Sequence, residues 1–151
     1  MKIIELLITE NFDYWLSKIN ESTWKAGKFL YELIKNNKLK EHTSENVKVF
    51  LLVDNFDLVS FCILADKDEI ELSNIKPWIG FLYTFEKYRG NRYSSILIKH
   101  CEDYAKKLGY QNIYISTNHE NLYEKYGYNL YLENVLNIYG SYSQVYIKRL
   151  N

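Results

Sequence analysis

The residues from Arg89 to Ser95 have the side chains and the spacing that could hold a phosphate group. An apolar stretch, WIGFLYTF, gives way here to the polar turn RGNRYS, and an amphipathic pattern follows. A helix that begins at such a turn presents unpaired backbone N–H groups and the positive end of its dipole, which suits a pyrophosphate. Gly90 allows close backbone approach, and Ser94 or Ser95 could add a hydroxyl donor. Taken alone, however, the hexapeptide is explained more easily as an ordinary strand-to-helix connection with a solvated arginine.

Composition narrows the classes of function. The 151 residues include 19 basic and 19 acidic side chains, so no net charge draws the protein to nucleic acid or to an anionic membrane. Three histidines without a CxxC spacing give little support to a metal site, and neither a Ser-His-Asp set nor a P-loop signature is present. We therefore expect no metal, no nucleic acid and no membrane among the partners.

The cysteines and the first residues bear on the cellular compartment. Cys62 lies in an apolar run and Cys101 in an expected helix, far apart in the chain, so both are expected to be buried, reduced thiols. The opening MKIIELLITE is too short and too acidic for a signal peptide. No apolar stretch approaches the roughly 20 residues that a membrane helix needs. These features favour a soluble, cytoplasmic protein.

Hydrophobic periodicity predicts the elements that hold the turn in place. Apolar runs predict strands at residues 2–9, 47–53, 58–64, 77–85, 111–116, 128–136 and 144–150. Helical spacing predicts one helix after Asn11, a second after Ser22 or Thr23, a third from Ser94 to Leu108 and a short fourth from His119 to Tyr126. The polar stretch from Asn36 to Asn46 is expected to be loop.

The order of these elements, β-α-α-β-β-β-α-β-α-β-β, predicts an α/β (α+β) fold. Hairpins combine with a strand-helix-strand crossover, so we expect a mixed, mostly antiparallel sheet of about seven strands, flanked by about four helices. No repeat or low-complexity segment interrupts the pattern. Since 47% of the residues are hydrophobic, residues 1–151 are expected to form a single domain around one continuous core.

Several segments together resemble the GNAT-type N-acetyltransferases, which transfer acyl groups from acetyl-coenzyme A (acetyl-CoA) to amines. These segments are FLYTFEKYRG, RGNRYS, KKLGY, NIYIST and NLYEKYGY, and the order of elements matches as well. The family's pyrophosphate signature is Arg or Gln, two variable residues, Gly, one variable residue, then Gly or Ala. Arg89 occupies the first position, whereas Arg92 stands at the expected glycine and Ser94 at the last small residue. The similarity is strong from about Val47 to Tyr128.

Arg92 is the main departure from the family pattern. If residue 92 has helical dihedral angles, an arginine fits there, its amide still points inward and its charge can add to phosphate binding. An arginine at this position is also what a non-catalytic relative would show. Two functions therefore stay open, an acetyltransferase and a coenzyme-A-binding or peptide-binding module on the same fold.

The resemblance implies a set of residues that bind acetyl-CoA. In this fold the strand before the turn splays from its neighbour, and the pantetheine arm pairs with main-chain groups in the gap. Gly80 in this strand fits a bulge or a close approach, although spacing between core aromatics explains it nearly as well. The residues expected to contact acetyl-CoA are Leu82, Thr84, Arg89, Gly90, Asn91, Arg92, Tyr93, Ser94, Ser95 and Asn118.

The resemblance also implies a proton donor, Tyr123. In the family a tyrosine in this segment, followed four residues later by glycine and an aromatic residue, lies near the thioester sulfur and acts as general acid. A phenol with an ordinary pKa of about 10 stays protonated at neutral pH and can donate to the departing thiolate. The chain has fifteen tyrosines, so packing is the alternative role for Tyr123.

The group that removes a proton from the acceptor amine is less evident. The strand at 77–84 carries neither a carboxylate nor a histidine. Asp68 and Glu69, in the run ADKDEIEL, could approach the strand ends, and we take Glu69 as the candidate base; the alternative is a solvated loop. His119 is more often structural at such a position near a helix start.

These interpretations combine into one expected function. The chain is expected to move an acetyl group from acetyl-CoA to an amine of a small molecule or peptide by direct attack, with a catalytically inactive binding module as the alternative. The sequence does not identify the acceptor. It allows for a homodimer without deciding the oligomeric state.

Overall fold

One seven-stranded sheet, in the order β1-β2-β3-β4-β5-β7-β6, runs through the computed structural model, which describes residues 1–151. The strands are β1 (Lys2–Glu5), β2 (Lys48–Asp54), β3 (Asp57–Ala65), β4 (Trp78–Thr84), β5 (Asn112–Thr117), β6 (Asn129–Leu136) and β7 (Tyr142–Arg149). All neighbouring strands are antiparallel except β4 and β5, which are parallel. The expected mixed, mostly antiparallel sheet of seven strands is confirmed.

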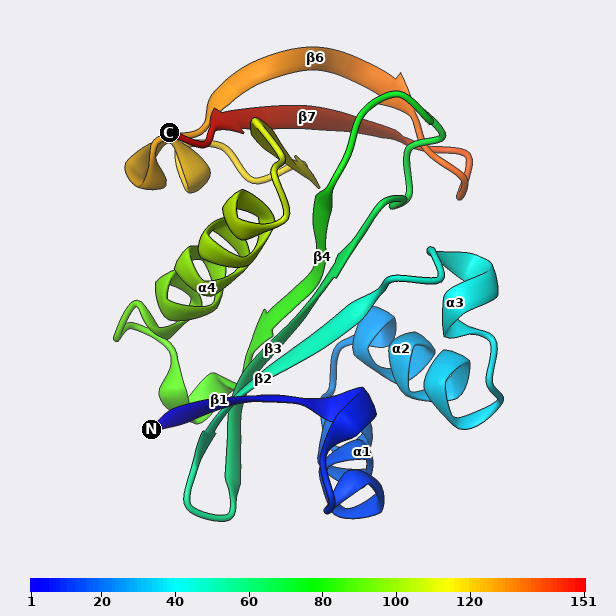
Figure 1. Ribbon diagram of the computed structural model, residues 1–151, viewed down its shortest axis with the longest axis vertical. Helices are drawn as coiled ribbons and strands as arrows, with labels where there is room; N and C mark the ends of the chain where they lie inside the picture. Colours follow the sequence, from blue (N-terminus) through cyan, green and yellow to red (C-terminus); the bar gives the residue numbers. More distant parts are fainter.

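Helices cover both faces of this sheet. In Figure 1, α4 (Tyr93–Lys107) lies on one side, and α1 (Phe12–Asn20) and α2 (Lys25–Lys35) lie on the other, with α3 (Leu39–His42) beyond α2. Three 3-10 turns complete the chain: η1 (Leu6–Ile8), η2 (Glu86–Tyr88) and η3 (Tyr123–Tyr126). The helix α4 crosses over between the two parallel strands, as the element order predicted.

Three short elements differ from the expectation. The strand expected over residues 2–9 ends at Glu5, and Leu6–Ile8 form the 3-10 turn η1 instead. The stretch from Asn36 to Asn46 contains α3, a single helical turn in which Leu39 is buried and the Thr43 hydroxyl donates to the Leu39 carbonyl (2.7 Å). Conversely, no α-helix forms from His119 to Tyr126, where only the 3-10 turn η3 is present. Asn121 has a φ of 60°, a left-handed conformation that cannot continue a right-handed helix.

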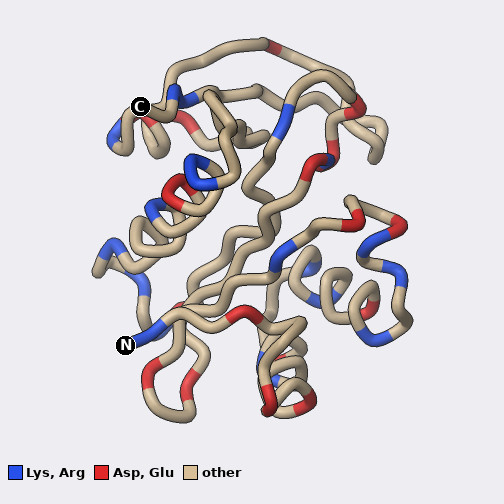
Figure 2. The backbone as a smooth tube through the Cα atoms, viewed as in Figure 1, with Lys and Arg blue, Asp and Glu red and all other residues tan.

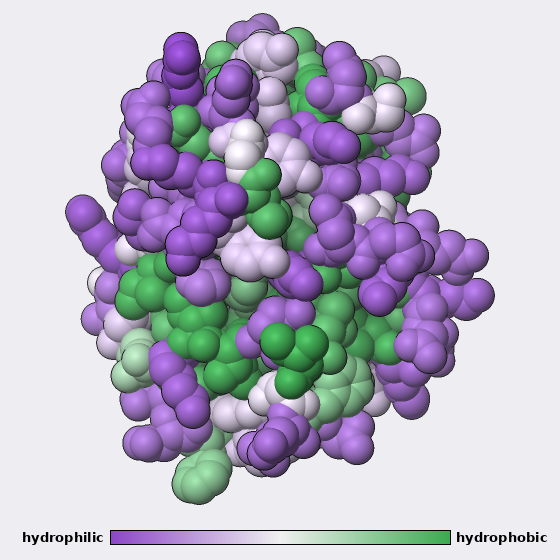
Figure 3. All heavy atoms as spheres, in the orientation of Figure 1, coloured by the Kyte–Doolittle hydropathy of each residue, from purple (hydrophilic) through white to green (hydrophobic).

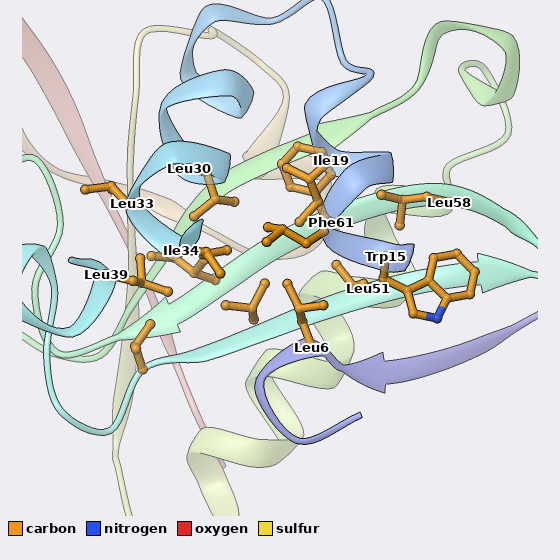
Figure 4. Close-up of a cluster of buried hydrophobic side chains, with 14 of the residues drawn as sticks. Leu6, Trp15, Ile19, Leu30, Leu33, Ile34, Leu39, Leu51, Leu58 and Phe61 are labelled. Carbon is orange, nitrogen blue, oxygen red and sulfur yellow. The ribbon is translucent and has the colours of Figure 1, made fainter. Parts of the chain in front are cut away.

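The apolar core is divided by the sheet into two large clusters. Between the sheet and α1 and α2, side chains such as Trp15, Leu30 and Phe61 interlock (Figure 4). On the other face, residues of α4 such as Leu97 and Cys101 pack against β3 and β5. In Figure 3, hydrophobic residues of the visible face gather in its lower half, around β1, while polar residues dominate its upper half. β4 lies near the centre of the sheet and borders both clusters.

Cys62 and Cys101 come together across the interface between β3 and α4. Both thiols are fully buried and free, as expected, and their sulfur atoms lie 3.6 Å apart. Their separation in sequence gave no sign of this contact. Burial, together with the neighbouring Cys62 thiol, raises the pKa of Cys101, so the thiol stays protonated.

Two irregularities of β4 shape its surroundings. Its pairing with β5 is limited to Trp78 opposite Tyr114 and Ile79 opposite Ile115, so the two strands part after Ile79. On its other side, the register with β3 shifts between Phe61 and Ile63, which is a β-bulge. At this bulge Phe81 has a φ of 50°, a strained conformation for an aromatic residue. β4 therefore presents an unpaired edge from Gly80 onward.

Candidate functional site

The turn that follows β4 presents a row of backbone amides with no partner in the protein. The Ser95 amide donates to the Arg92 carbonyl (3.1 Å), whereas residues 90 to 94 donate to no backbone carbonyl. Gly90 has a φ of 87°, and α4 begins directly after Arg92. Consecutive free amides at a helix N-terminus form a concave site for an anion. The local geometry expected of a phosphate-binding turn is thus present.

Arg92 has a conformation that differs from the one we considered. Its φ of 58° and ψ of 28° place it in the left-handed region, not in the right-handed helical region. Glycine has no Cβ to clash there, so it is the residue favoured at such a position. A glycine would adopt this backbone without strain, whereas here it carries an arginine side chain.

The side chains of the turn are mostly exposed and hydrogen-bonded to the local backbone. Arg89 Nε donates to the Thr84 carbonyl (2.9 Å), and its guanidinium lies 5.2 Å from the centre of the Tyr83 ring. Ser95 Oγ donates to the Arg92 carbonyl (2.6 Å), so this hydroxyl is already engaged. Figure 2 shows the basic positions grouped at the turn that leads into α4. Arg89 is held in place before any ligand arrives.

Beyond the unpaired edge of β4 lies a cavity of about 250 Å³. It is bounded by β4, by the end of β5, by η3, by the start of α2 and the end of α3, and by the connections after β3 and between β6 and β7. The residues that line it are Trp24, Ala26, His42, Thr43, Asp68, Glu69, Ile79, Gly80, Phe81, Leu82, Ile115, Ser116, Thr117, Asn118, His119, Tyr123 and Tyr139. Neither Lys nor Arg is among them, so its only formally charged side chains at neutral pH, apart from histidine, are two carboxylates.

Tyr123 lies in the wall of this cavity, on η3. Its side chain is largely buried, and burial raises its pKa to about 12. The phenol makes no hydrogen bond to another side chain, so its proton faces the cavity without a competing partner. A phenol in this state is neutral throughout the physiological range and can act only as a proton donor.

A buried polar network supports the turn that carries Tyr123. The Glu102 carboxylate accepts hydrogen bonds from the Tyr128 hydroxyl (2.8 Å) and from Lys148 Nζ (3.0 Å). Lys148 Nζ also donates to the Tyr126 carbonyl (2.8 Å), the last residue of η3. Burial, followed by the charge of Glu102, raises the pKa of Tyr128. This network joins α4, η3 and β7 and thereby holds Tyr123 in position.

The two carboxylates of the cavity are adjacent in sequence but differ in their contacts. Glu69 Oε1 accepts hydrogen bonds from Ser116 Oγ (2.5 Å) and Ser143 Oγ (2.9 Å), and the Glu69 carbonyl accepts one from the Ile138 amide (2.9 Å). Asp68 has no side-chain partner. Burial raises its pKa to about 7, and the charge of Glu69 adds to this effect. Glu69 is thus tied to β5 and β7, whereas the Asp68 carboxylate has no side-chain partner and only a backbone hydrogen bond from the Glu69 amide.

The structure gathers some of the expected site residues and leaves others apart. Tyr123, Glu69, Leu82 and Asn118 all line the cavity, although the Asn118 side-chain amide donates to the Tyr142 carbonyl (3.1 Å). Thr84 and residues 89 to 95 lie outside it, around the far end of β4. The unpaired part of β4 connects the two regions. Residues 79 to 84 span roughly 17 Å at about 3.3 Å per residue.

Several cavity residues carried no sequence signal for this role. His42 belongs to α3, the helix that sequence did not predict, and Tyr139 comes from the connection between β6 and β7. Trp24, the residue before α2, also lines the cavity. Thr117 is the last residue of β5, the strand parallel to β4, and its position at that strand end is the sequence signal that could have identified it.

No group of three or more His, Cys, Asp or Glu side chains is arranged to hold a metal ion. None of the helices has the length and apolar character needed to cross a membrane.

Comparison with known proteins gives a consistent result. Residues 9–128 match the family described as the acetyltransferase (GNAT) family. No match was found among curated proteins. A probable acetyltransferase from Staphylococcus epidermidis ATCC 12228 is 18% identical, with 99% of each chain covered and a TM-score of 0.68. An aminoglycoside 6'-N-acetyltransferase complexed with coenzyme A is 18% identical, with 100% of this chain and 98% of that chain covered and a TM-score of 0.69. An acetyltransferase of the GNAT family from Staphylococcus aureus Mu50 is 16% identical, with 99% of each chain covered and a TM-score of 0.66.

Proposed function

The chain belongs to the GNAT acetyltransferase family, and we propose that it transfers the acetyl group of acetyl-CoA to the amine of a small molecule or peptide by direct attack. Acetyl-CoA is the cosubstrate of this family, so acetyl transfer is the general activity. The amine as acceptor is the part that we propose. The similarity to an aminoglycoside N-acetyltransferase supports an amine without identifying it.

The observation that supports the proposal is that the unpaired edge of β4 leads from the turn to the cavity. Free amides at residues 90 to 94 fit a pyrophosphate, and the strands β4 and β5 part after Ile79. An extended pantetheine arm would pair with the open edge of β4 at Leu82 and Thr84. Its thioester would then reach the cavity in which Tyr123 lies.

Residue roles follow from this placement. Arg89 and the amides of Gly90, Asn91, Tyr93 and Ser94 bind the pyrophosphate, with Arg92 as an additional positive charge. Ser95 contributes through its place in the first turn of α4, because its hydroxyl is bonded to the backbone. Asn118 contacts the cosubstrate from the end of β5. Tyr123 protonates the coenzyme A thiolate as it departs.

A non-catalytic coenzyme-A-binding or peptide-binding module remains the second candidate. It is favoured by one observation, the arginine at a left-handed position where the family has glycine. Its long, polar side chain starts at the mouth of the anion site. A cytoplasmic location and a homodimer are further predictions of the sequence that the fold leaves open.

A binding measurement combined with a thiol-release assay tests the proposal. Calorimetry should detect acetyl-CoA binding at micromolar concentration, and a panel of primary amines should contain at least one that accelerates coenzyme A release. Absence of acetyl-CoA binding at high micromolar concentration would refute the proposal. Binding without release for every amine, including amino-terminal peptides, would favour the non-catalytic module.

A further inference from the structure

The connection between β3 and β4 places a carboxylate where the acetyl group would be attacked. We propose that Asp68 holds the ammonium group of a small cationic acceptor and takes its proton. This inference rests on the proposed acetylation of an amine, and it assigns the base to a different residue from Glu69. It follows from four properties of the cavity.

The first property is the position of Asp68 against β4. A Cβ built on Gly80 would lie 2.5 Å from Asp68 Oδ1, so the carboxylate fills the space that a side chain at residue 80 would occupy. Gly80 lies immediately before the bulge residue Phe81 and after the last residue paired with β5. The absence of a side chain at residue 80 thus allows a carboxylate from another segment to reach the open edge of β4.

The second property is the charge around Asp68. The groups that face the cavity from the packed elements are Glu69 on the same connection, His42 on α3, His119 after β5, Tyr123 on η3 and Tyr139 between β6 and β7. Lys67, beside Asp68 in the chain, is exposed to solvent and does not line the cavity. Burial, followed by the charge of Lys67, lowers the pKa of His42, so this ring tends to be neutral. A cationic ligand therefore meets an acidic cavity that no lysine or arginine lines.

The third property is that the two carboxylates have different contacts and therefore different roles. Glu69 is fixed by the hydroxyls of Ser116 and Ser143, which stabilise its negative charge. Asp68 lacks such side-chain partners, and burial, followed by the charge of Glu69, raises its pKa despite a backbone hydrogen bond from the Glu69 amide, so protonation of Asp68 is favoured. A carboxylate that readily accepts a proton near neutral pH suits general base catalysis. Glu69 instead keeps the connection in place and adds a fixed negative field.

The fourth property is the size and the aromatic lining of the cavity. Its volume of about 250 Å³ lies below the ~300–1,000 Å³ typical of sites for drug-sized ligands. Trp24 and Phe81 form adjacent walls, with ring centres 6.5 Å apart. Aromatic faces attract both apolar groups and organic cations. The acceptor class is therefore a small primary amine with an apolar body.

The proton and electron balance of the step is as follows. Asp68 takes one proton from the ammonium group, and the nitrogen lone pair then forms a bond to the thioester carbonyl carbon. The carbon–sulfur bond breaks with its electron pair passing to sulfur, which receives the Tyr123 proton. The second proton lost from nitrogen restores Tyr123. The products are the acetamide, coenzyme A thiol and one proton, which Asp68 releases to solvent.

Kinetics with 2-phenylethylamine as the probe test this role. In the wild type, kcat/KM should rise with pH through about 7, where Asp68 loses its proton. In Asp68→Asn it should fall by about 100-fold and rise only towards the amine's own pKa, about 10 for an alkylamine. Gly80→Ala should also lower kcat/KM, because the new Cβ would displace the end of the Asp68 side chain. This end is flexible, so the backbone does not have to move. Glu71→Gln, an exposed carboxylate of the same connection, is the matched control and should leave the profile unchanged.

Binding to the coenzyme A complex separates the Asp68 role from turnover. The amine should bind the wild type at least tenfold more tightly than Asp68→Asn, and the uncharged analogue 2-phenylethanol should not distinguish the two proteins. Equal amine affinity in both, or an unchanged pH profile in Asp68→Asn, would overturn the inference. Amine binding that depends on Asp68 without any coenzyme A release would support the ammonium contact and refute acetyl transfer. A wild type that neither binds nor acetylates the amine would overturn the proposed acceptor class.

Discussion

The two ends of β4 present two kinds of site. Beyond its C-terminal end, residues 89 to 95 offer free backbone amides and exposed basic side chains, and the local chain alone provides the geometry. Along its N-terminal half, the cavity is lined by residues from seven separate segments, many of them buried or half-buried, and burial shifts the pKa of Asp68 and Tyr123. Binding of acetyl-CoA and the chemical step should therefore depend on different residues. Substitutions in the turn should change only the affinity for acetyl-CoA, whereas substitutions in the cavity should change the rate of the reaction.

Replacing Tyr123 with Phe should produce the largest effect. Turnover should fall by about 100-fold, because a general acid typically contributes 10²–10⁴ in rate, while the affinity for acetyl-CoA should stay the same. Steady-state kinetics and calorimetry on the same preparation measure both quantities. Tyr126→Phe, on the same 3-10 turn but outside the cavity, serves as the control. An unchanged turnover would remove Tyr123 from the mechanism.

Replacing Arg89 with Ala should have the complementary effect at the other end of β4. The affinity for acetyl-CoA should fall by about 1.5–3 kcal/mol through the loss of a charge-assisted contact. Turnover at saturating acetyl-CoA should remain within about twofold, because the cavity is untouched. Lys87→Ala removes a neighbouring exposed charge and should matter less. If Arg89→Ala binds acetyl-CoA normally, the pyrophosphate contact assigned to Arg89 is wrong.

Asp68→Asn should make the protein more stable at alkaline pH while it loses activity. The pKa of Asp68 is raised to about 7 from an ordinary 3.8, so the native state keeps a proton that the unfolded chain releases between these pH values. Stability of the wild type therefore falls as pH rises from 4 to 7, and the variant lacks this decline. The full shift corresponds to about 4 kcal/mol, which we halve to about 2 kcal/mol at pH 8 because the group is partly solvated.

Urea denaturation of both proteins at pH 4.5 and pH 8 measures this difference. The two free energies of unfolding should differ more at pH 8 than at pH 4.5. Equal pH dependence in the two proteins would show that the Asp68 carboxylate is not destabilised in the native cavity.

Substitutions of Arg92 should have the smallest effect, and they test the role of this side chain in the turn. Arg92→Gly removes a left-handed strain of about 1–2 kcal/mol and adds about 0.5–1 kcal/mol of unfolded-chain entropy, so a net stabilisation of about 0.5 kcal/mol is expected. Arg92→Ala keeps the Cβ and the strain but removes the charge. Weaker acetyl-CoA binding in both variants would indicate a phosphate contact. Tighter binding in both would indicate that the side chain obstructs the site.

The sequence predicted most of the regular elements because their apolar patterns are strong. Each of the seven strands was placed within a few residues, and Gly109 and Gly127 end α4 and η3 with a φ of 92° each, as expected of terminating glycines. The failures are short elements. The helix α3 is one turn stabilised by the burial of Leu39, a tertiary contact that local pattern does not reveal.

The site was predictable where it depends on local backbone and unpredictable where it depends on distant partners. The turn at Arg89 follows from contiguous residues. The bulge was indicated by Gly80, but the positive φ falls on Phe81, an aromatic residue that rarely adopts it. Asp68 and Glu69 are equivalent in sequence. Only the hydroxyls of Ser116 and Ser143, which lie 47 and 74 residues beyond Glu69, show which of the two carboxylates is held by side chains.

The strand β7 closes the cavity from two sides. Ser143 holds Glu69 on one side, and Lys148 holds the end of η3 on the other. Both residues belong to the C-terminal hairpin, whereas the backbone of the turn before α4 makes no hydrogen bond with either of them. The cavity therefore requires the last hairpin of the chain to be docked, and a truncation within this hairpin should disrupt the cavity while leaving the local geometry of the turn in place.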